Sequence, residues 1–301
     1  NAEEREEVGS EEIKNEVKGE NFVNNLLQKV NDINVTDYLD GNIHEMYSFH
    51  HETTVQLPEN IDYRYIGSDP YNYVKFNGDE IWRIIGVFPD KEGVNHIKLI
   101  RNDFIGFRSW DYRTNWGINL WSMAQLKSYL NAENSDDNYT LTEQAQNQIV
   151  ETTWFVGGVT TSKQSVTVYY NKERGNDTYV NNGVKYQNEW VGKIGLMYPS
   201  DYGYTYANGV SNTCYNNLYN CSETNSTGWL ANALNKDEWT ITPWSSRNDY
   251  VEIINKHSNA ASAYHSYGVR PVVYLKSDIE FKVGNYDGSI DKPYELVTSE
   301  L

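Results

Sequence analysis

The segment that decides the fold is YNYVKFNGDEIWRIIGVF, residues 71–88, in which apolar and polar side chains alternate around Asn77-Gly78. An Asn-Gly pair between two alternating runs is the strongest short-range signal of a β-hairpin. The second run, Ile81–Phe88, is almost continuously apolar, which is typical of a strand inside a sheet. VNHIKLIRNDFIG, residues 94–106, adds a strand over about 94–101. The sequence therefore predicts a three-stranded antiparallel meander over residues 72–101.

Outside the meander, helical and extended patterns do not alternate strictly. We predict helices over about 11–31, 121–131, 140–153 and 228–234, and Thr140 with Glu143 has the spacing of a capping box for the third. Further strands are predicted at WVGKIGLMYP (190–199), DEWTITP (237–243), YVEIIN (250–255), VRPVVYL (269–275) and IEFKVG (279–284). This order indicates an α+β protein with antiparallel sheets, a few flanking helices and long loops. We expect residues 1–60 to form an N-terminal helical and extended region and residues 61–301 to form the main domain.

Composition and charge exclude some partners. The chain has 301 residues, is 39% hydrophobic and carries a net charge of −17. A nucleic-acid-binding protein would show a basic face instead, so we expect no nucleic-acid partner. No run approaches the ~18–20 apolar residues that span a bilayer, so we expect no membrane insertion of this fragment. Because Asn1-Ala2 resembles the remnant of a cleaved tag, we expect that an anchor was removed.

Two cysteines, Cys214 and Cys221, lie in the Asn- and Thr-rich segment TCYNNLYNCSE, with six residues between them. Such a short loop can close into a disulfide if the backbone turns back on itself. Free thiols are an alternative, and a zinc site is disfavoured because no histidine lies nearby. A disulfide would indicate an oxidising compartment and an extracellular protein.

Several longer motifs resemble an uncharacterised extracellular domain family of Gram-positive surface proteins. The motifs lie between about residues 60 and 296 and are IWRIIGVF (81–88), IKLIRND (97–103), SWD (109–111), WVGKIGLMYPSDYGY (190–204), WTITPWSS (239–246), GVRPVVYLKSDI (268–279) and GNYDGSIDKPYEL (284–296). The resemblance implies a fold related to C-type lectins and to the formylglycine-generating-enzyme superfamily. The sugar-binding Glu-Pro-Asn and Trp-Asn-Asp motifs of calcium-dependent lectins are missing, so calcium-dependent sugar binding does not carry over.

The common catalytic and cofactor-binding motifs are absent from the sequence. The chain has no Gly-x-Ser-x-Gly elbow, no His-Glu-x-x-His, no Walker loop and no Gly-x-Gly-x-x-Gly. Residues 285–291, NYDGSID, could hold calcium through Asp and Asn oxygens, but an Asp-Gly turn is the simpler interpretation. We expect no catalytic residues, no cofactor and no metal, and we expect the protein not to be an enzyme.

Two aromatic groups are the candidate ligand-binding residues, because flat rings stack on sugar faces while nearby polar groups bind hydroxyls. The first group lies around Trp110, Asp111 and Tyr112, with Trp116 and Trp121 nearby in the sequence. The second consists of Tyr202, Tyr204, Tyr206, Tyr215, Tyr219 and Trp244. The alternative is that these rings fill the core.

Three hypotheses about function remain open at this point. The first is a secreted or cell-surface adhesin-like domain that binds a glycan or a host or cell-surface protein without catalysis. The second is a structural, pilin-like surface subunit, suggested by the predicted N-terminal helix. The third is a glycan-acting enzyme, which would need two carboxylates ~5–9 Å apart in one cleft.

Overall fold

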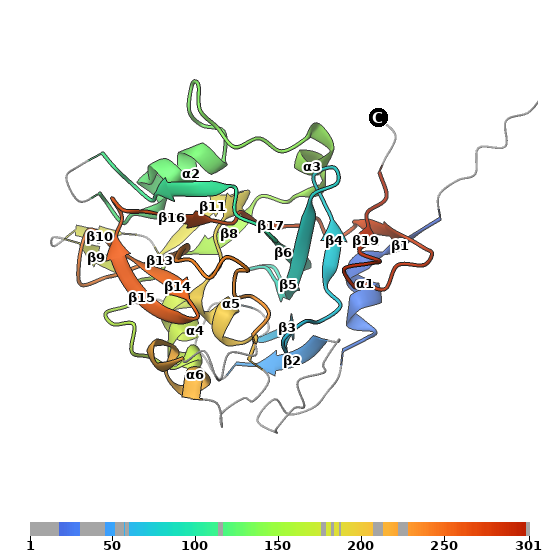
Figure 1. Ribbon diagram of the computed structural model, residues 1–301, viewed down its shortest axis with the longest axis horizontal. Helices are drawn as coiled ribbons and strands as arrows, with labels where there is room; N and C mark the ends of the chain where they lie inside the picture. The colour runs from blue at the N-terminus through green and yellow to red at the C-terminus, as the bar shows by residue number, and fades with distance from the viewer. Residues whose placement is uncertain are drawn as a thin grey trace, which may run out of the picture.

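The computed structural model describes residues 18–30, 46–51, 57, 60–113, 117–175, 179–181, 184–186, 188–206, 213–221 and 228–298. Over these residues the protein is mixed and rich in sheet, with few and short helices (Figure 1). The sheets are mainly antiparallel. The predicted α+β class with antiparallel sheets is therefore confirmed.

The predicted meander is present and lies in the larger sheet. Strands β4 (Tyr73–Lys75), β5 (Ile81–Pro89) and β6 (Asn95–Arg101) pair antiparallel in chain order. Asn77 and Gly78 both adopt positive φ, at 61° and 78°. Lys75 pairs with Ile81 and the Phe76 N–H donates to the Glu80 carbonyl, so the loop holds three residues, 77–79, rather than the two of the tightest hairpin turns. The central strand β5 is buried along seven consecutive residues, which explains why its sequence is apolar without alternation.

The larger sheet has eight strands from distant parts of the chain. Its main order is β12-β17-β6-β5-β3-β2, where β2 is Met46–His50, β3 is Ile61–Tyr65, β12 is Ile194–Gly195 and β17 is Val272–Tyr274. Strand β4 pairs with β5, and β19 (Tyr294–Glu295) pairs parallel with β4. Residues 46–65 thus contribute two strands that the sequence patterns did not indicate.

The second sheet has five strands in the order β15-β14-β13-β16-β7. They are β7 (Gly106–Ser109), β13 (Glu238–Pro243), β14 (Tyr250–Asn255), β15 (His257–Ser262) and β16 (Ser266–Val269). The strand predicted over 269–275 is divided at Arg270-Pro271, because β16 belongs to this sheet and β17 to the larger one. The buried guanidinium of Arg270 contacts Glu238 of β13 through Nε and Nη2, at 2.8 and 2.7 Å. This ion pair anchors the point where the chain crosses between sheets.

The remaining strands form small two-stranded sheets. Strand β8 (Thr152–Phe155) pairs with β11 (Glu189–Gly192), and β9 (Tyr179–Asn181) pairs with β10 (Val184–Tyr186). The strand predicted over 190–199 is therefore two short strands, β11 and β12, which pair with different partners.

Two of the predicted helices are shorter than expected, and one prediction is wrong. Residues 121–131 form a 3₁₀ turn, η1 (Trp121–Met123), followed by α2 (Gln125–Leu130). Helix α3 covers only Glu143–Gln148, and its cap is Thr142 rather than Thr140, since the Thr142 hydroxyl accepts from the Ala145 N–H. Residues 228–234 form turns rather than a helix.

Three helical segments were not predicted. They are α4 (Val166–Arg174), α5 (Pro199–Gly203) and α6 (Thr213–Asn216), which a 3₁₀ turn η3 (Leu218–Asn220) follows. Val, Thr and Tyr have low helix propensity, which hides VTVYYNKER as a helix. Its start is fixed by Ser165, whose hydroxyl accepts from the Val168 N–H. Helix α5 contacts β14 of one sheet, and its Asp201 bonds to side chains of β3 and β6 in the other.

The N-terminal helix predicted over 11–31 is only partly present. Helix α1 covers Phe22–Leu27, and the preceding Gly19–Asn21 form β1, which pairs with β18 (Glu280–Lys282). Residues 11–17 lie outside the described part. The side chains of Phe22, Val23 and Leu26 are buried, so α1 packs against the body of the protein.

Candidate functional site

The first predicted aromatic group lies mostly in the core. The Trp110 ring has no exposed surface, packs 5.3 Å from the Trp121 ring and donates through Nε1 to the Thr240 carbonyl. The buried Asp111 carboxylate accepts hydrogen bonds from the Arg113 guanidinium. Tyr112 is 61% exposed, and Trp116 lies outside the described residues. Among the described residues of this group, only Tyr112 has an exposed ring.

The second aromatic group is also largely internal. Tyr202, which lies in helix α5, and Tyr204 and Tyr206, which follow it, are at most 2% exposed, so rings that were expected in an open loop are buried. Tyr215 packs 5.9 Å from the Tyr204 ring, and Trp244 donates to Glu252. Tyr219 is 39% exposed. Since a buried ring cannot stack on a ligand, the two groups do not form the open platform that the sequence suggested.

The two cysteines form a disulfide. The Cα atoms of Cys214 and Cys221 lie 4.5 Å apart, and the bond joins α6 to the end of η3. Both residues are buried. The bond closes the short loop that the sequence indicated.

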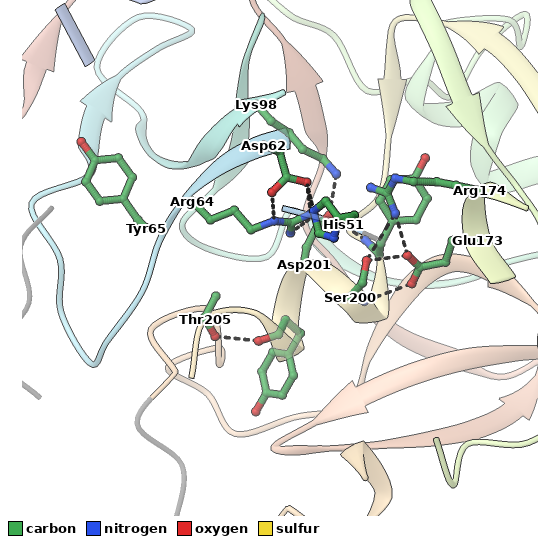
Figure 2. Close-up of polar contacts among 12 residues, drawn as sticks. His51, Asp62, Arg64, Tyr65, Lys98, Glu173, Arg174, Ser200, Asp201 and Thr205 are labelled. Atoms are coloured by element: carbon green, nitrogen blue, oxygen red, sulfur yellow. Dashed lines mark hydrogen bonds and ion pairs between the residues drawn. The ribbon is translucent and has the colours of Figure 1, made fainter. Parts of the chain in front are cut away.

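The most distinctive polar feature is a buried network of charged side chains between β3, β6, α4 and α5 (Figure 2). On β3, Arg64 donates from Nε and Nη2 to both oxygens of Asp62, at 2.7 and 2.9 Å. His51 lies 2.9 Å from the same carboxylate and stacks on Tyr170. Burial acts to raise the pKa of Asp62, but the charges of Arg64 and His51 outweigh it and hold that pKa below its usual range.

Asp201 of α5 links this pair to β6, which is separated from β3 by β5 in the same sheet. Its carboxylate accepts from Arg64 at 3.1 Å, from Lys98 at 2.5 Å and from the Tyr198 backbone N–H at 2.9 Å. Neither Lys98 nor Asp201 has exposed side-chain surface. Burial lowers the pKa of Lys98 to about 8, although Asp201 favours the charged form. Aromatic rings surround the ammonium group, the nearest being Tyr198 at 4.3 Å.

The last part of the network is on α4. Arg174 donates from Nη1 to Glu173 at 2.9 Å, and Glu173 accepts from both the hydroxyl and the backbone N–H of Ser200. Burial raises the pKa of Glu173, while Arg174 acts in the opposite direction. The network therefore joins two non-adjacent strands of the larger sheet, β3 and β6, to helices α4 and α5, and it fixes α5 between the sheets.

The space beside this network is too small for an organic substrate. A cavity of about 30 Å³ lies against Asp62, Tyr170 and Arg174 and is also lined by residues of β5, β6 and β8. A single water needs about 10–15 Å³ measured this way, so the cavity fits one or two water-sized groups. We therefore assign a structural role to the network as a whole.

An open groove lies elsewhere, between α3, β18 and the segment after β19. Its main part has a volume of about 490 Å³ and its lining residues are Gln144, Asn147, Gln148, Lys276, Asp278, Ile279, Glu280, Val297 and Thr298. An adjoining part of about 230 Å³ shares Gln144, Gln148 and Thr298 and extends to the β4–β5 turn. In this second part Glu295 accepts from Lys75 and Lys282, at 2.9 and 3.0 Å. We call the two parts together the α3 groove.

The wall that α3 contributes has a pattern visible in the sequence. Gln144, Asn147 and Gln148 are spaced i, i+3 and i+4, which places three amides on one helix face. Gln148 donates to the Val297 carbonyl, and the amides of Gln144 and Asn147 make no hydrogen bond with the described residues. Each amide can donate and accept. Amides at this spacing belong to no aromatic or catalytic motif, so the sequence pattern alone did not indicate a site here.

The described residues show neither a metal-ligand cluster nor a membrane-spanning helix. In that part of the chain, no group of three or more His, Cys, Asp or Glu side chains could hold a metal ion. None of the helices described is long and apolar enough to cross a membrane.

Comparison of the chain with family models, curated proteins and solved structures finds no match.

Proposed function

We propose that this chain is a non-enzymatic binding domain of the cell surface or of a secreted protein, and that it binds an oligosaccharide in the α3 groove. The observation that carries the proposal is the groove itself, with an amide face on α3 opposite the charged edge of β18. Pockets of ~300–1,000 Å³ are typical of small-ligand sites, and the main part of this groove lies in that range.

The groove chemistry favours a sugar over an apolar ligand. Hydroxyl groups both donate and accept, so they pair with side-chain amides such as those of Gln144 and Asn147. Lys276 and Asp278 add a donor and an acceptor on the opposite wall, while Ile279 and Val297 offer apolar surface for a sugar face. Exposed Tyr112 and Tyr219 are not among the residues that line the groove.

The extracellular part of the proposal has separate support. A disulfide such as Cys214–Cys221 persists in oxidising compartments and is rare in the cytosol. The motifs that resemble Gram-positive surface proteins are consistent with such a location. A C-type-lectin-like topology remains part of this proposal.

The packing of α1 favours a binding domain over the pilin-like alternative. An assembled subunit of that kind was expected to extend a long N-terminal helix from the body. Instead α1 has six residues, and three of them are buried. This favours a binding domain.

The test is a glycan array probed with the purified chain and with two α3 variants, in calcium and again in EDTA. The groove variant is Gln144→Ala/Asn147→Ala. The control is Gln146→Ala on the same helix, whose amide does not line the groove and donates instead to the Leu141 carbonyl. We expect saturable binding by the wild type and the control, unchanged in EDTA, and its loss in the groove variant. No binding by the wild type, or equal binding by the groove variant, would refute the proposal.

A further inference from the structure

Arg174 has hydrogen-bonding capacity that the buried network does not use. Its guanidinium lies between the Tyr170 and Tyr198 rings, 4.0 and 4.6 Å from their centroids. Only Nη1 bonds to the network, to Glu173 and Ser200. Within the described residues, Nε and Nη2 have no hydrogen-bond partner, although the side chain is 5% exposed. Figure 2 shows these two nitrogens directed away from Glu173 and Ser200.

Arg174 is one of the residues that line the cavity of about 30 Å³. The neighbouring donors are hydroxyls, from Thr152 and Thr153 of β8 and from Tyr170. None of these three hydroxyls makes a hydrogen bond with the described residues. The cavity therefore combines a fixed cation with hydroxyl donors.

The carboxylates of the cavity are already occupied. Asp62 accepts from Arg64 and His51, and Asp90 accepts from His96 and from two backbone N–H groups of its own turn. Lys91, which also lines the cavity, bonds to Glu189. Both carboxylates are thus engaged by other groups, while the free N–H groups of Arg174 and the three hydroxyls have no anionic partner, and an anion of the size of one or two waters would accept from them.

We propose that this cavity is a binding site for a small monovalent inorganic anion, of which chloride is the physiological example, held by Arg174 and by the hydroxyls of Thr152, Thr153 and Tyr170. The size of the cavity excludes larger organic anions. Bound anion would hold α4 against β8 and would stabilise the folded state. This site is independent of the α3 groove.

The location is tested by soaking crystals of the full chain in sodium bromide and measuring anomalous diffraction. Bromide stands in for chloride and scatters anomalously. A peak within hydrogen-bonding distance of Arg174 Nε or Nη2 is expected. A cavity filled by water alone would give no peak there, which would overturn the proposal.

The energetic effect is tested by thermal unfolding in sodium chloride and in sodium gluconate at equal ionic strength, since gluconate is too large for the cavity. We expect the melting temperature to rise by roughly 2–4 °C in chloride at about ten times its dissociation constant. Thr153→Val, which keeps Arg174 and so avoids a folding defect, is expected to reduce this shift. Thr140→Val, in an exposed loop, is expected to retain it. Equal melting temperatures in the two salts would overturn the proposal.

Discussion

Replacing Asp201 by Asn tests the structural role of the buried network. The change keeps the shape of the side chain and removes the one carboxylate that faces both Lys98 and Arg64, at 2.5 and 3.1 Å. Lys98 is then a fully buried cation without its counter-ion. Removing one partner of a buried ion pair costs about 3–5 kcal/mol, out of a total stability of about 5–15 kcal/mol for a typical domain.

The assay is urea unfolding at pH 7, followed by the fluorescence of the nine tryptophans. Asp137→Asn is the matched control, because its carboxylate pairs with Arg108 at 2.9 Å but is 71% exposed, and such pairs contribute about 0–1 kcal/mol. Adding Lys98→Met to Asp201→Asn is expected to recover part of the loss, since the uncompensated charge is removed. A cost below about 1 kcal/mol for Asp201→Asn, equal to the control, would refute this reasoning.

Three further predictions concern the effect of single substitutions on stability. Burial raises the pKa of Glu252 from 4.5 to about 8, so wild-type stability is lost as pH rises through that range. Between pH 5 and pH 8.5 the loss is roughly 4 kcal/mol, and Glu252→Gln should remove it when urea unfolding is measured at the two pH values, whereas an unchanged pH dependence would contradict this reasoning. Cys214→Ser opens the loop to Cys221 and should cost about 2.5 kcal/mol on the chain-entropy account, and dithiothreitol should lower wild-type stability by the same amount without affecting the variant. Gly86→Ala places a methyl group 1.9 Å from the Tyr63 carbonyl oxygen. We therefore expect the free energy of unfolding to fall by about 3 kcal/mol or more, with a lower melting temperature. A variant as stable as the wild type would show that β3 can move away.

The local parts of the fold were predictable from sequence, and the long-range pairings were not. Asn77-Gly78 and the apolar run of β5 specify a hairpin through short-range geometry alone. In contrast, β12, β17 and β6 come from three distant segments, and the sequence contains no local signal of their order. The division of residues 269–275 between two sheets follows from a tertiary ion pair between Arg270 and Glu238.

The candidate site was harder to predict because burial is a tertiary property. Tyr202, Tyr204 and Tyr206 have the composition of a binding loop, yet the turn formed by α5 and the residues after it places all three in the core. Sequence signals for the polar features do exist: Asp62 and Arg64 alternate on one strand, and Lys98 interrupts the apolar strand β6. These positions indicate buried partners but do not identify them.

The most direct test of the proposed function is amide chemical-shift mapping. The ¹⁵N-labelled chain would be titrated with the oligosaccharide that gives the strongest glycan-array signal. We predict that the largest shifts occur at residues 144, 147, 148, 276, 278–280 and 297–298, which line the main part of the α3 groove. Shifts centred instead on Tyr112 or Tyr219, or no shifts at saturating oligosaccharide, would contradict the account.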